Sequence, residues 1–455
     1  MTTHQEPFNP YELRAESVEE PPLMLSAIAL RVGPGIILAS TIVGSGELIA
    51  TTVLGAEHGY SLLWLIIVSC VIKIVVQNEL GRYTIGTGET SLEAFDRVPG
   101  SRLGASWVVW AWFLSLALAL VAVGGMLGGI AQVVHQIVPS VPIVAWVWVI
   151  NIVTLIVLSV GRYELIERVS MAMVAGFTLM TVGAAFVLLD SPQYFSWGAI
   201  VEGLSFRMPE DGFLSAVAVM GLTGVGASEL GIYPYWCLEK GYARFTGPRD
   251  DTPSWTRRAH GWIRVLGFDV VNSMVIYTFA TIAFYLLGAG ILNGMGIVPR
   301  GTEMIETLSN MYTATLGEWS GYVFLIGAVA VLYSTVFAGT AARSRMLADW
   351  LGIMKAYDKG NYGLRLRFQR LFVVVLLVVP SLYYMFFQEP VMMVKMAGAV
   401  EAMMLPIIGF STVYLRYRHL PSSIAPKGWI TLALWVTSAL MAVMMGYSVL
   451  LRLAP

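Results

Sequence analysis

The sequence has 455 residues, of which 57% are hydrophobic and 13% are charged, and its mean hydropathy is +0.71. Soluble domains carry roughly 25% charged residues, so this composition indicates an integral membrane protein. The net charge of −1 and the pI near 6.5 give no sign of a nucleic-acid partner. The two cysteines, Cys70 and Cys237, lie in or beside apolar stretches, which argues against a disulfide framework or a zinc site.

Residues 1–26 are rich in glutamate and lack the basic start of a signal peptide, so we interpret them as a cytoplasmic tail. Eleven apolar stretches follow, each near the roughly 20 residues that a helix needs to cross a bilayer. They cover residues 27–57, 60–82, 105–131, 142–160, 167–189, 213–238, 262–292, 319–348, 368–387, 391–416 and 428–452. The pattern predicts an all-α polytopic membrane protein with eleven transmembrane helices and no soluble domain.

Basic residues predict the orientation of these helices. If the N-terminus is cytoplasmic, most of the 28 Lys and Arg residues fall in cytoplasmic segments, and only Arg207, Arg300 and Arg452 lie outside. The positive-inside rule therefore places the N-terminus in the cytoplasm and the C-terminus outside. We expect the protein in the plasma (inner) membrane.

A short motif occurs twice, each time in the middle of an apolar stretch. Residues 43–48 read VGSGEL in the first stretch, and residues 225–230 read VGASEL in the sixth. These two stretches would run in opposite directions, which indicates an inverted repeat of helices 1–5 (27–189) and 6–10 (213–416), with 428–452 as helix 11. Such repeats are typical of secondary transporters, whose substrate site lies at mid-membrane between two broken helices.

The glycines of each motif predict a break in the helix. Gly44 and Gly46 would end the first half-helix, and Gly224 and Gly226 would do so in the sixth stretch. Ser45 and Ser228 are then expected to cap the second half-helices. The acidic residue that follows each serine, Glu47 or Glu229, would lie in the first turn.

Two carboxylates at this depth need compensation, because an ionised group there costs about 2.5 to 3.5 kcal/mol even on the lenient insertion scale. A bound cation would provide it. Carboxylate, hydroxyl and carbonyl oxygens suit hard ions such as Mg²⁺, Mn²⁺ or Ca²⁺. We therefore predict a cation site that is formed by the side chains and backbone of Gly44, Ser45, Glu47, Gly226, Ala227, Ser228 and Glu229. The alternative is that each glutamate is protonated or paired with Lys73 and only separates helices.

Three other charges lie within predicted helices. Lys73 is about nine residues, or roughly 13 Å, from the end of its helix, so it needs a buried partner, for which Glu47, Glu229 and Glu401 are candidates. Its ammonium would either form a static ion pair or replace a co-transported cation. Glu401 would face the pathway or pair with Lys73. Lys395, near the outer end of its helix, is expected to snorkel to the interface.

Several segments resemble the NRAMP family of divalent-metal transporters. They include GPGIILAS from Gly33, QNELGRYTIGTGETSLEAF from Gln77, STVFAGTAARSRMLADWLG from Ser334 and LPIIGF from Leu405. The resemblance covers roughly residues 30–450. It implies a five-plus-five inverted-repeat (LeuT/APC-like) fold with helices 1 and 6 broken and an eleventh helix added.

The sequence departs from the family at the metal site. Where the family has Asp-Pro-Gly-Asn, this chain has Gly44 to Glu47, and the family's Met-Pro-His is replaced by a stretch near Ser228, Glu229 and Leu230. The methionine that selects transition metals and the histidine associated with proton movement are therefore absent. In this respect the sequence is similar to the NRAMP-related magnesium transporters.

The sequence predicts an alternating-access transporter, secondary-active or facilitated, of a divalent cation such as Mg²⁺ or Mn²⁺. The stretch GTGET at residue 86 lacks the lysine of a nucleotide-binding loop, and no catalytic residues or cofactors are expected, so we predict no enzyme activity. Proton coupling and oligomeric state stay open. Two alternatives remain: a carrier of an organic cation or other small solute, and a non-transporting NRAMP-like membrane protein.

Overall fold

A computed structural model describes residues 8–160, 164–209 and 211–453, apart from the side chains of Ser45, 159–170 and 451–453. The described chain is almost entirely helical. Two-residue strands, β1 (Arg102–Leu103) and β2 (Ala105–Ser106), pair in antiparallel register. The all-helical prediction is therefore confirmed.

The helices of the first half are α1 (Leu25–Ala29), α2 (Pro34–Ile42), α3 (Thr52–His58), α4 (Leu63–Ile72), α5 (Ile74–Thr87), α6 (Ser91–Asp96), α7 (Trp107–Ile137), α8 (Ile143–Val160), α9 (Glu164–Leu188) and α10 (Trp197–Gly203). Those of the second half are α11 (Phe213–Leu222), α12 (Ala227–Lys240), α13 (Tyr242–Thr246), α14 (Pro253–Leu287), α15 (Met304–Leu316), α16 (Trp319–Ile353), α17 (Tyr362–Phe387), α18 (Pro390–Arg418) and α19 (Gly428–Leu453). Short segments are π-helical at η2 (Ser45–Thr51) and η4 (Gly288–Leu292), and 3₁₀-helical at η1 (Ala15–Ser17), η3 (Gly59–Leu62), η5 (Gly301–Glu303) and η6 (Ser422–Ile424).

Nine helical stretches in the described residues are long and apolar enough to cross a membrane, and Ile143–Leu158 is a shorter apolar helix. The first predicted crossing is divided, because its helix begins only at Pro34 and is interrupted at the first repeated motif. The exact count of eleven crossings and the limits of the two repeats, 27–189 and 213–416, stay predictions. Both cysteines are buried and free, in agreement with the absence of a disulfide.

Several helices begin where the sequence supplies a cap. Thr90 and Glu93 form a reciprocal capping box at α6, Thr252 caps α14 ahead of a proline, and Asn361 caps α17. At the other end of α5, Gly88 adopts the left-handed conformation with a φ of 75°. These local signals fix where the long helices start and stop.

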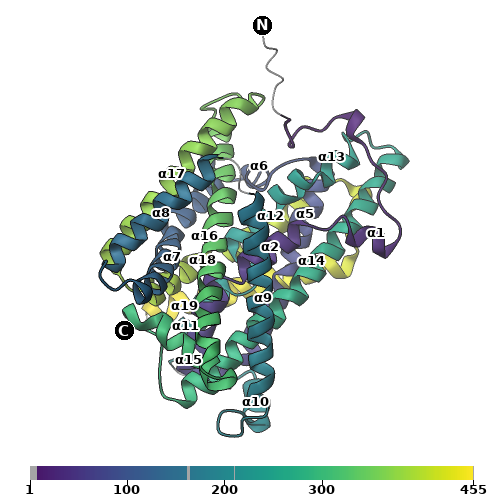
Figure 1. The fold of residues 1–455 in the computed structure, drawn as a ribbon. Helices are drawn as coiled ribbons and strands as arrows, with labels where there is room; N and C mark the ends of the chain where they lie inside the picture. The colour runs from purple at the N-terminus through teal and green to yellow at the C-terminus, as the bar shows by residue number, and fades with distance from the viewer. Residues whose placement is uncertain (1–7, 161–163, 210, 454–455) are drawn as a thin grey trace.

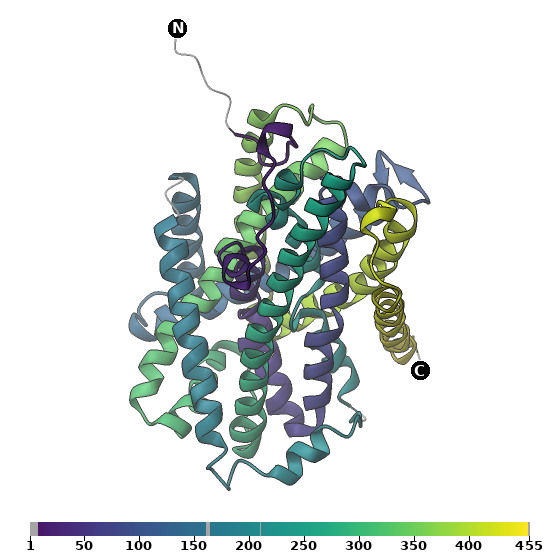
Figure 2. The ribbon, with the colours of Figure 1, turned by 90° about the vertical axis from the view of Figure 1, so that its right-hand side faces the viewer.

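The helices form one bundle in which α2, α12, α16 and α18 meet near the middle (Figure 1). The N-terminal segment, α6 and α13 lie at one end of the bundle, called the tail end below, and α10 and α15 lie at the far end. The turned view places α9 and α19 at opposite edges (Figure 2). The central helices are therefore enclosed by others, as a site at mid-membrane requires.

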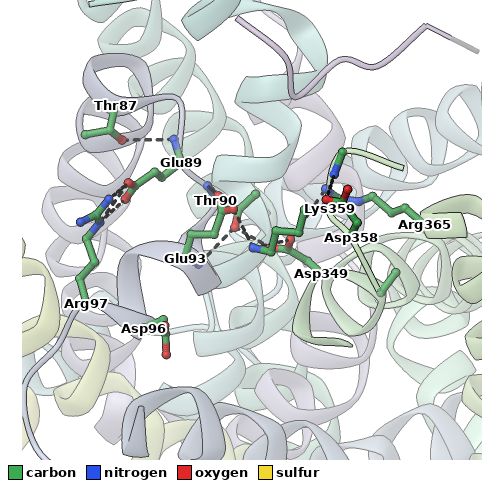
Figure 3. A network of polar contacts seen from close by, with 12 residues as sticks. Thr87, Glu89, Thr90, Glu93, Asp96, Arg97, Asp349, Asp358, Lys359 and Arg365 are labelled. Carbon is green, nitrogen blue, oxygen red and sulfur yellow. Dashed lines mark hydrogen bonds and ion pairs between the residues drawn. The ribbon is translucent and has the colours of Figure 1, made fainter. Parts of the chain in front are cut away.

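A polar network ties the helices together at the tail end (Figure 3). The hydroxyl of Thr90 donates to the buried carboxylate of Asp349 at 2.6 Å, and so does Tyr235 at 2.7 Å. Lys359 donates to Glu93 at 2.7 Å, and its ammonium lies 3.5 Å from Asp349. Because these residues come from α6, α12, α16 and the segment before α17, the network holds four separate parts of the chain in place.

Candidate functional site

The first repeated motif interrupts its helix, as predicted. The interruption begins at Val43, one residue before the first glycine of the motif. The helix α2 ends at Ile42, and η2 begins at Ser45, so the break consists of Val43 and Gly44. Gly46 lies inside η2 and does not end the first half-helix. Gly44 is needed here because a Cβ at this position would lie 2.1 Å from the Thr335 hydroxyl of α16.

Gly44 is the capping residue of η2. The side chain of Ser45, which we predicted to cap the second half-helix, lies outside the described part of the chain. The segment is π-helical, a form that is frequent at functional sites. Glu47 does lie in its first turn, as predicted.

The second motif also breaks its helix as predicted. The helix α11 ends at Leu222 and α12 begins at Ala227, with Gly224 at a φ of 64° in the gap. Only glycine adopts this conformation readily. Glu229 again lies in the first turn of the second half-helix.

Ser228 does not cap α12, which corrects the second serine prediction. Gly226 is the capping residue, and Ser228 donates from both its backbone N–H and its hydroxyl to the carboxylate of Glu401 on α18. The N–H bond is 2.7 Å long. A carboxylate from another helix thus occupies the positive end of α12, where a negative charge is favoured.

Glu47 connects the two breaks. Its Oε1 accepts the N–H of Gly224 and the hydroxyl of Thr281, each at 3.1 Å, and its side chain is fully buried. Its Oε2 is buried and has no hydrogen-bond partner. One lone carboxylate oxygen therefore remains available for a cation or a proton.

Lys73 is not paired with a glutamate, which corrects the prediction about its partner. Its ammonium donates to the carbonyls of Met220, at 2.7 Å, and Thr223, at 2.5 Å. No carboxylate oxygen of the described residues lies within 4.0 Å of it. The carbonyl end of a helix carries partial negative charge, so the end of α11 is a suitable partner for this buried cation.

Lys395 also differs from its prediction. Instead of reaching freely to the interface, its ammonium lies 2.6 Å from the carboxylate of Glu57 at the end of α3. Both side chains are 22% exposed. This ion pair joins α18 to α3 at the far end.

A cavity of about 40 Å³ lies where the two breaks meet. Its wall is formed by Thr41, Ile42, Gly46, Ala119, Ala122, Met126, Leu222, Glu229, Thr335, Arg343, Ala397 and Glu401. A water molecule needs about 10 to 15 Å³ by this kind of measure, so the cavity has room for a small ion with one or a few waters. Two carboxylates and one guanidinium are the ionisable groups on its wall.

The side chains of Glu229 and Glu401 thus line one cavity. Glu47 does not line it, although its neighbour Gly46 does. Ser228 orients Glu401, and Gly226 makes room for Glu229, because a Cβ on this glycine would lie 2.5 Å from Oε2. No cluster of three or more His, Cys, Asp or Glu side chains suited to a metal occurs among the described residues.

Arg343 is the residue of the cavity that the sequence prediction missed. It lies near the end of a long apolar stretch and was counted with the cytoplasmic basic residues. A signal was present, because Gly339 precedes it by one helical turn and leaves room for a side chain that leans back toward the membrane centre.

Sequence comparisons match the chain to one protein family and to several individual proteins. A family model described as natural resistance-associated macrophage protein-like (Nramp) matches residues 35–451. The divalent metal cation transporter MntH of Mycobacterium tuberculosis is 27% identical over 326 residues, which is 70% of each chain. An uncharacterised protein of Pasteurella multocida, PM0681, is 26% identical over 314 residues, which is 67% of each chain.

Solved structures show the same fold. A mutant form of the manganese transporter of Eremococcus coleocola superposes with a TM-score of 0.67 at 16% identity, covering 95% of this chain and 90% of that one. The structure of MhsT in complex with L-phenylalanine has a TM-score of 0.52 at 16% identity and covers 95% and 99%. The predicted LeuT-like fold is therefore confirmed.

Proposed function

We propose that this chain, which belongs to the natural resistance-associated macrophage protein-like (Nramp) family, carries a divalent metal cation across the membrane. The relatives named as divalent metal cation transporters support this class of substrate. The observation that carries the proposal is the enclosed cavity at the meeting point of two interrupted helices, with Glu229 and Glu401 on its wall. The protein is accordingly a transporter and not an enzyme.

The favoured cargo is a hard ion, Mg²⁺ or Mn²⁺, because the charged ligands on the cavity wall are carboxylate oxygens, while Met126 supplies one thioether. The carboxylates of Glu229 and Glu401 line the cavity and would bind the ion through oxygen, which hard ions prefer. Glu47 would join them through its unpartnered Oε2, since Gly46 beside it already lines the cavity. Backbone oxygens near Gly44, Gly226 and Ala227 would complete the shell, and Ser228 holds Glu401 in position.

We propose alternating access through two vestibules, one at each end of the bundle. A space of about 260 Å³ at the tail end is lined by residues of α2, α12 and α16, and one of about 450 Å³ at the far end is lined by residues of α3, α11 and α18. We place the tail end in the cytoplasm and the protein in the plasma (inner) membrane, on the basis of the distribution of basic residues.

An organic cation is the second candidate cargo. The cavity volume of about 40 Å³ favours an ion over a solute of several heavy atoms. Binding of an organic cation would also be insensitive to added Mg²⁺ or Mn²⁺. Competition between each metal and a labelled amine therefore separates the two candidates.

The function is tested by flux into reconstituted vesicles, with Mg²⁺, Mn²⁺ and Ca²⁺ supplied one at a time. We expect Glu47→Gln and Glu229→Gln to slow uptake of the preferred ion by about tenfold or more, which corresponds to about 1.4 kcal/mol of lost stabilisation. Glu202→Gln, at an exposed position on α10, is the matched control and should transport normally. Unchanged flux of every cation in both site variants would show that the assigned ligands are wrong.

A further inference from the structure

Arg343 brings a positive charge to the proposed cation site. It is the one basic side chain among the described residues that line the cavity, and it faces the same space as Glu229 and Glu401. A cation carrier has no evident need for a fixed positive charge there, because the guanidinium repels the cargo. Its presence therefore needs a reason other than binding.

The guanidinium is partly buried and has no fixed partner among the described residues. Its Nη1 is buried and makes no hydrogen bond, and no carboxylate oxygen of the described residues lies within 4.0 Å of it. A Cβ at Gly339 would lie 2.6 Å from this Nη1, so the side chain lies back along α16 over a glycine. The guanidinium therefore occupies the space that a side chain at position 339 would fill.

Apart from the two hydrogen bonds that Ser228 donates to Glu401, the rest of the cavity wall offers no compensation for the two carboxylates. The residues contributed by α2, η2, α7 and α11 are non-ionisable: Thr41, Ile42, Gly46, Ala119, Ala122, Met126 and Leu222. Thr335 and Ala397, from α16 and α18, are also neutral. Lys73 lies elsewhere, because its ammonium is bound to carbonyls at the end of α11. Arg343 is therefore the group that can balance the negative charge when no cation is bound.

We propose that Arg343 is a tethered counter-cation that compensates the carboxylates of the empty cavity and lets the carrier return without cargo. This inference rests on the proposed function. When a divalent cation binds between the carboxylates, the guanidinium is repelled and moves away from them. When the cation leaves, the guanidinium moves toward Glu229 and Glu401, and the site crosses the membrane without uncompensated negative charge.

The proposal separates two transport modes. Net uptake into metal-free vesicles requires the empty carrier to return, whereas exchange of metal inside for labelled metal outside does not. Removal of the tethered charge should therefore slow net uptake selectively. Substitution of a residue that has only a structural role, or of one that binds the metal, would slow net uptake and exchange together.

The test compares Arg343→Gln with the parent, using Mn²⁺ as the transported ion in reconstituted vesicles. We expect net Mn²⁺ uptake to fall by about tenfold or more, because an uncompensated charge at membrane depth is costly, while Mn²⁺–Mn²⁺ exchange keeps the parental rate. Retained exchange also demonstrates that the variant is folded. Equal net uptake in variant and parent would overturn the proposal, and so would an equal loss of uptake and exchange.

A further variant refines the test. Arg343→Lys keeps the charge and should retain net uptake. Failure of the underlying function looks different, because the parent protein itself would then move no divalent cation in either mode. If the parent transports Mn²⁺ and Arg343→Gln has normal net uptake, the proposed transport function stands and only the proposal that Arg343 is a tethered counter-cation is wrong.

Discussion

Lys73 shows how a buried charge can be stabilised without an opposite charge. Its ammonium donates to the carbonyls of Met220 and Thr223, which the break after α11 leaves without helical partners. Ser69, one turn earlier, directs its hydroxyl to the same two carbonyls at 3.4 to 3.5 Å. Gly224, next in the chain, donates to Glu47. Lys73 therefore holds the second break in the shape that positions Glu47.

Replacement of Lys73 should lower stability before it alters any chemistry. In Lys73→Met, two buried carbonyls lose their charged donor, and we expect the free energy of unfolding to fall by about 1 to 3 kcal/mol. The measurement is thermal unfolding of the purified protein in detergent. Lys427→Met, at an exposed position, is the control. A melting temperature equal to that of the parent would contradict this role for Lys73.

At the scale of single residues, the sequence predicts which residues lie at the site better than it predicts the groups that they contact. Glu47 and Glu229 were placed correctly in the first turns after both breaks, because glycine and acidic residues carry local signals. The partner of Lys73, the bond from Ser228 to Glu401 and the position of Arg343 all depend on contacts between helices distant in the chain. No local pattern encodes such contacts, so these predictions were wrong or were not made.

At the scale of helices, close contact between backbones fixes the cavity. A Cβ at Gly221 of α11 would lie 2.0 Å from the carbonyl oxygen of Gly398, and one at Gly398 would lie 2.2 Å from that of Ala218. The helices α11 and α18 therefore touch through their main chains. This approach brings Glu401 of α18 within reach of Ser228, just beyond the break.

Gly221→Ala should separate these two helices. The added methyl group meets backbone atoms that cannot rotate away, so we expect a loss of about 1 to 3 kcal/mol in the free energy of unfolding. Gly176→Ala is a matched control, since a Cβ there has no neighbour within 4 Å. Thermal unfolding of both variants is the measurement. Equal stability of the two would contradict the tight contact between α11 and α18.

Helix positions were largely predictable because apolar stretches of membrane length are a strong signal. The interruptions of both motif helices were also predictable from the glycines. The π-helical form of η2 was not predicted, and neither was the close approach of Thr335 from α16 to the break at Gly44. The start of α2 at Pro34 rather than residue 27 follows from Gly33 and Pro34, a local signal that the apolar pattern obscured.

At the scale of the whole molecule, ion pairs join helices at both ends of the bundle. At the tail end Arg345 of α16 lies 2.7 Å from Glu239 of α12, and the Tyr11 hydroxyl donates to the same carboxylate at 2.6 Å. Burial, assisted by the neighbouring Glu239, raises the pKa of Tyr11 well above its ordinary value, so its hydroxyl remains a donor. At the far end Lys395 and Glu57 form the corresponding pair.

Weakening the tail-end pair should shift the molecule toward opening at that end. A partly buried pair worth about 1 kcal/mol changes a conformational equilibrium by about fivefold. We expect Glu239→Gln to increase the labelling rate of a cysteine placed at Ala338, in the tail-end vestibule, by a factor of this order. A cysteine at Ala399, in the far-end vestibule, should label more slowly. The two native cysteines are buried, which keeps the background low.

The reciprocal change at the two reporters is the informative result. Faster labelling at both positions would indicate general loosening, and no change at either would show that the Arg345–Glu239 pair does not control access. Each reporter in the parent background is the control.

The central claim, that acidic side chains at two helix breaks hold a divalent cation, is tested most directly by anomalous diffraction from crystals grown with Mn²⁺. The account predicts an anomalous peak in the cavity between α2, α12, α16 and α18, at a coordination distance of about 2.0 to 2.6 Å from a carboxylate oxygen of Glu229. The peak should disappear in Glu229→Gln. A Mn²⁺ peak bound elsewhere, with this cavity empty at saturating metal, would contradict the account.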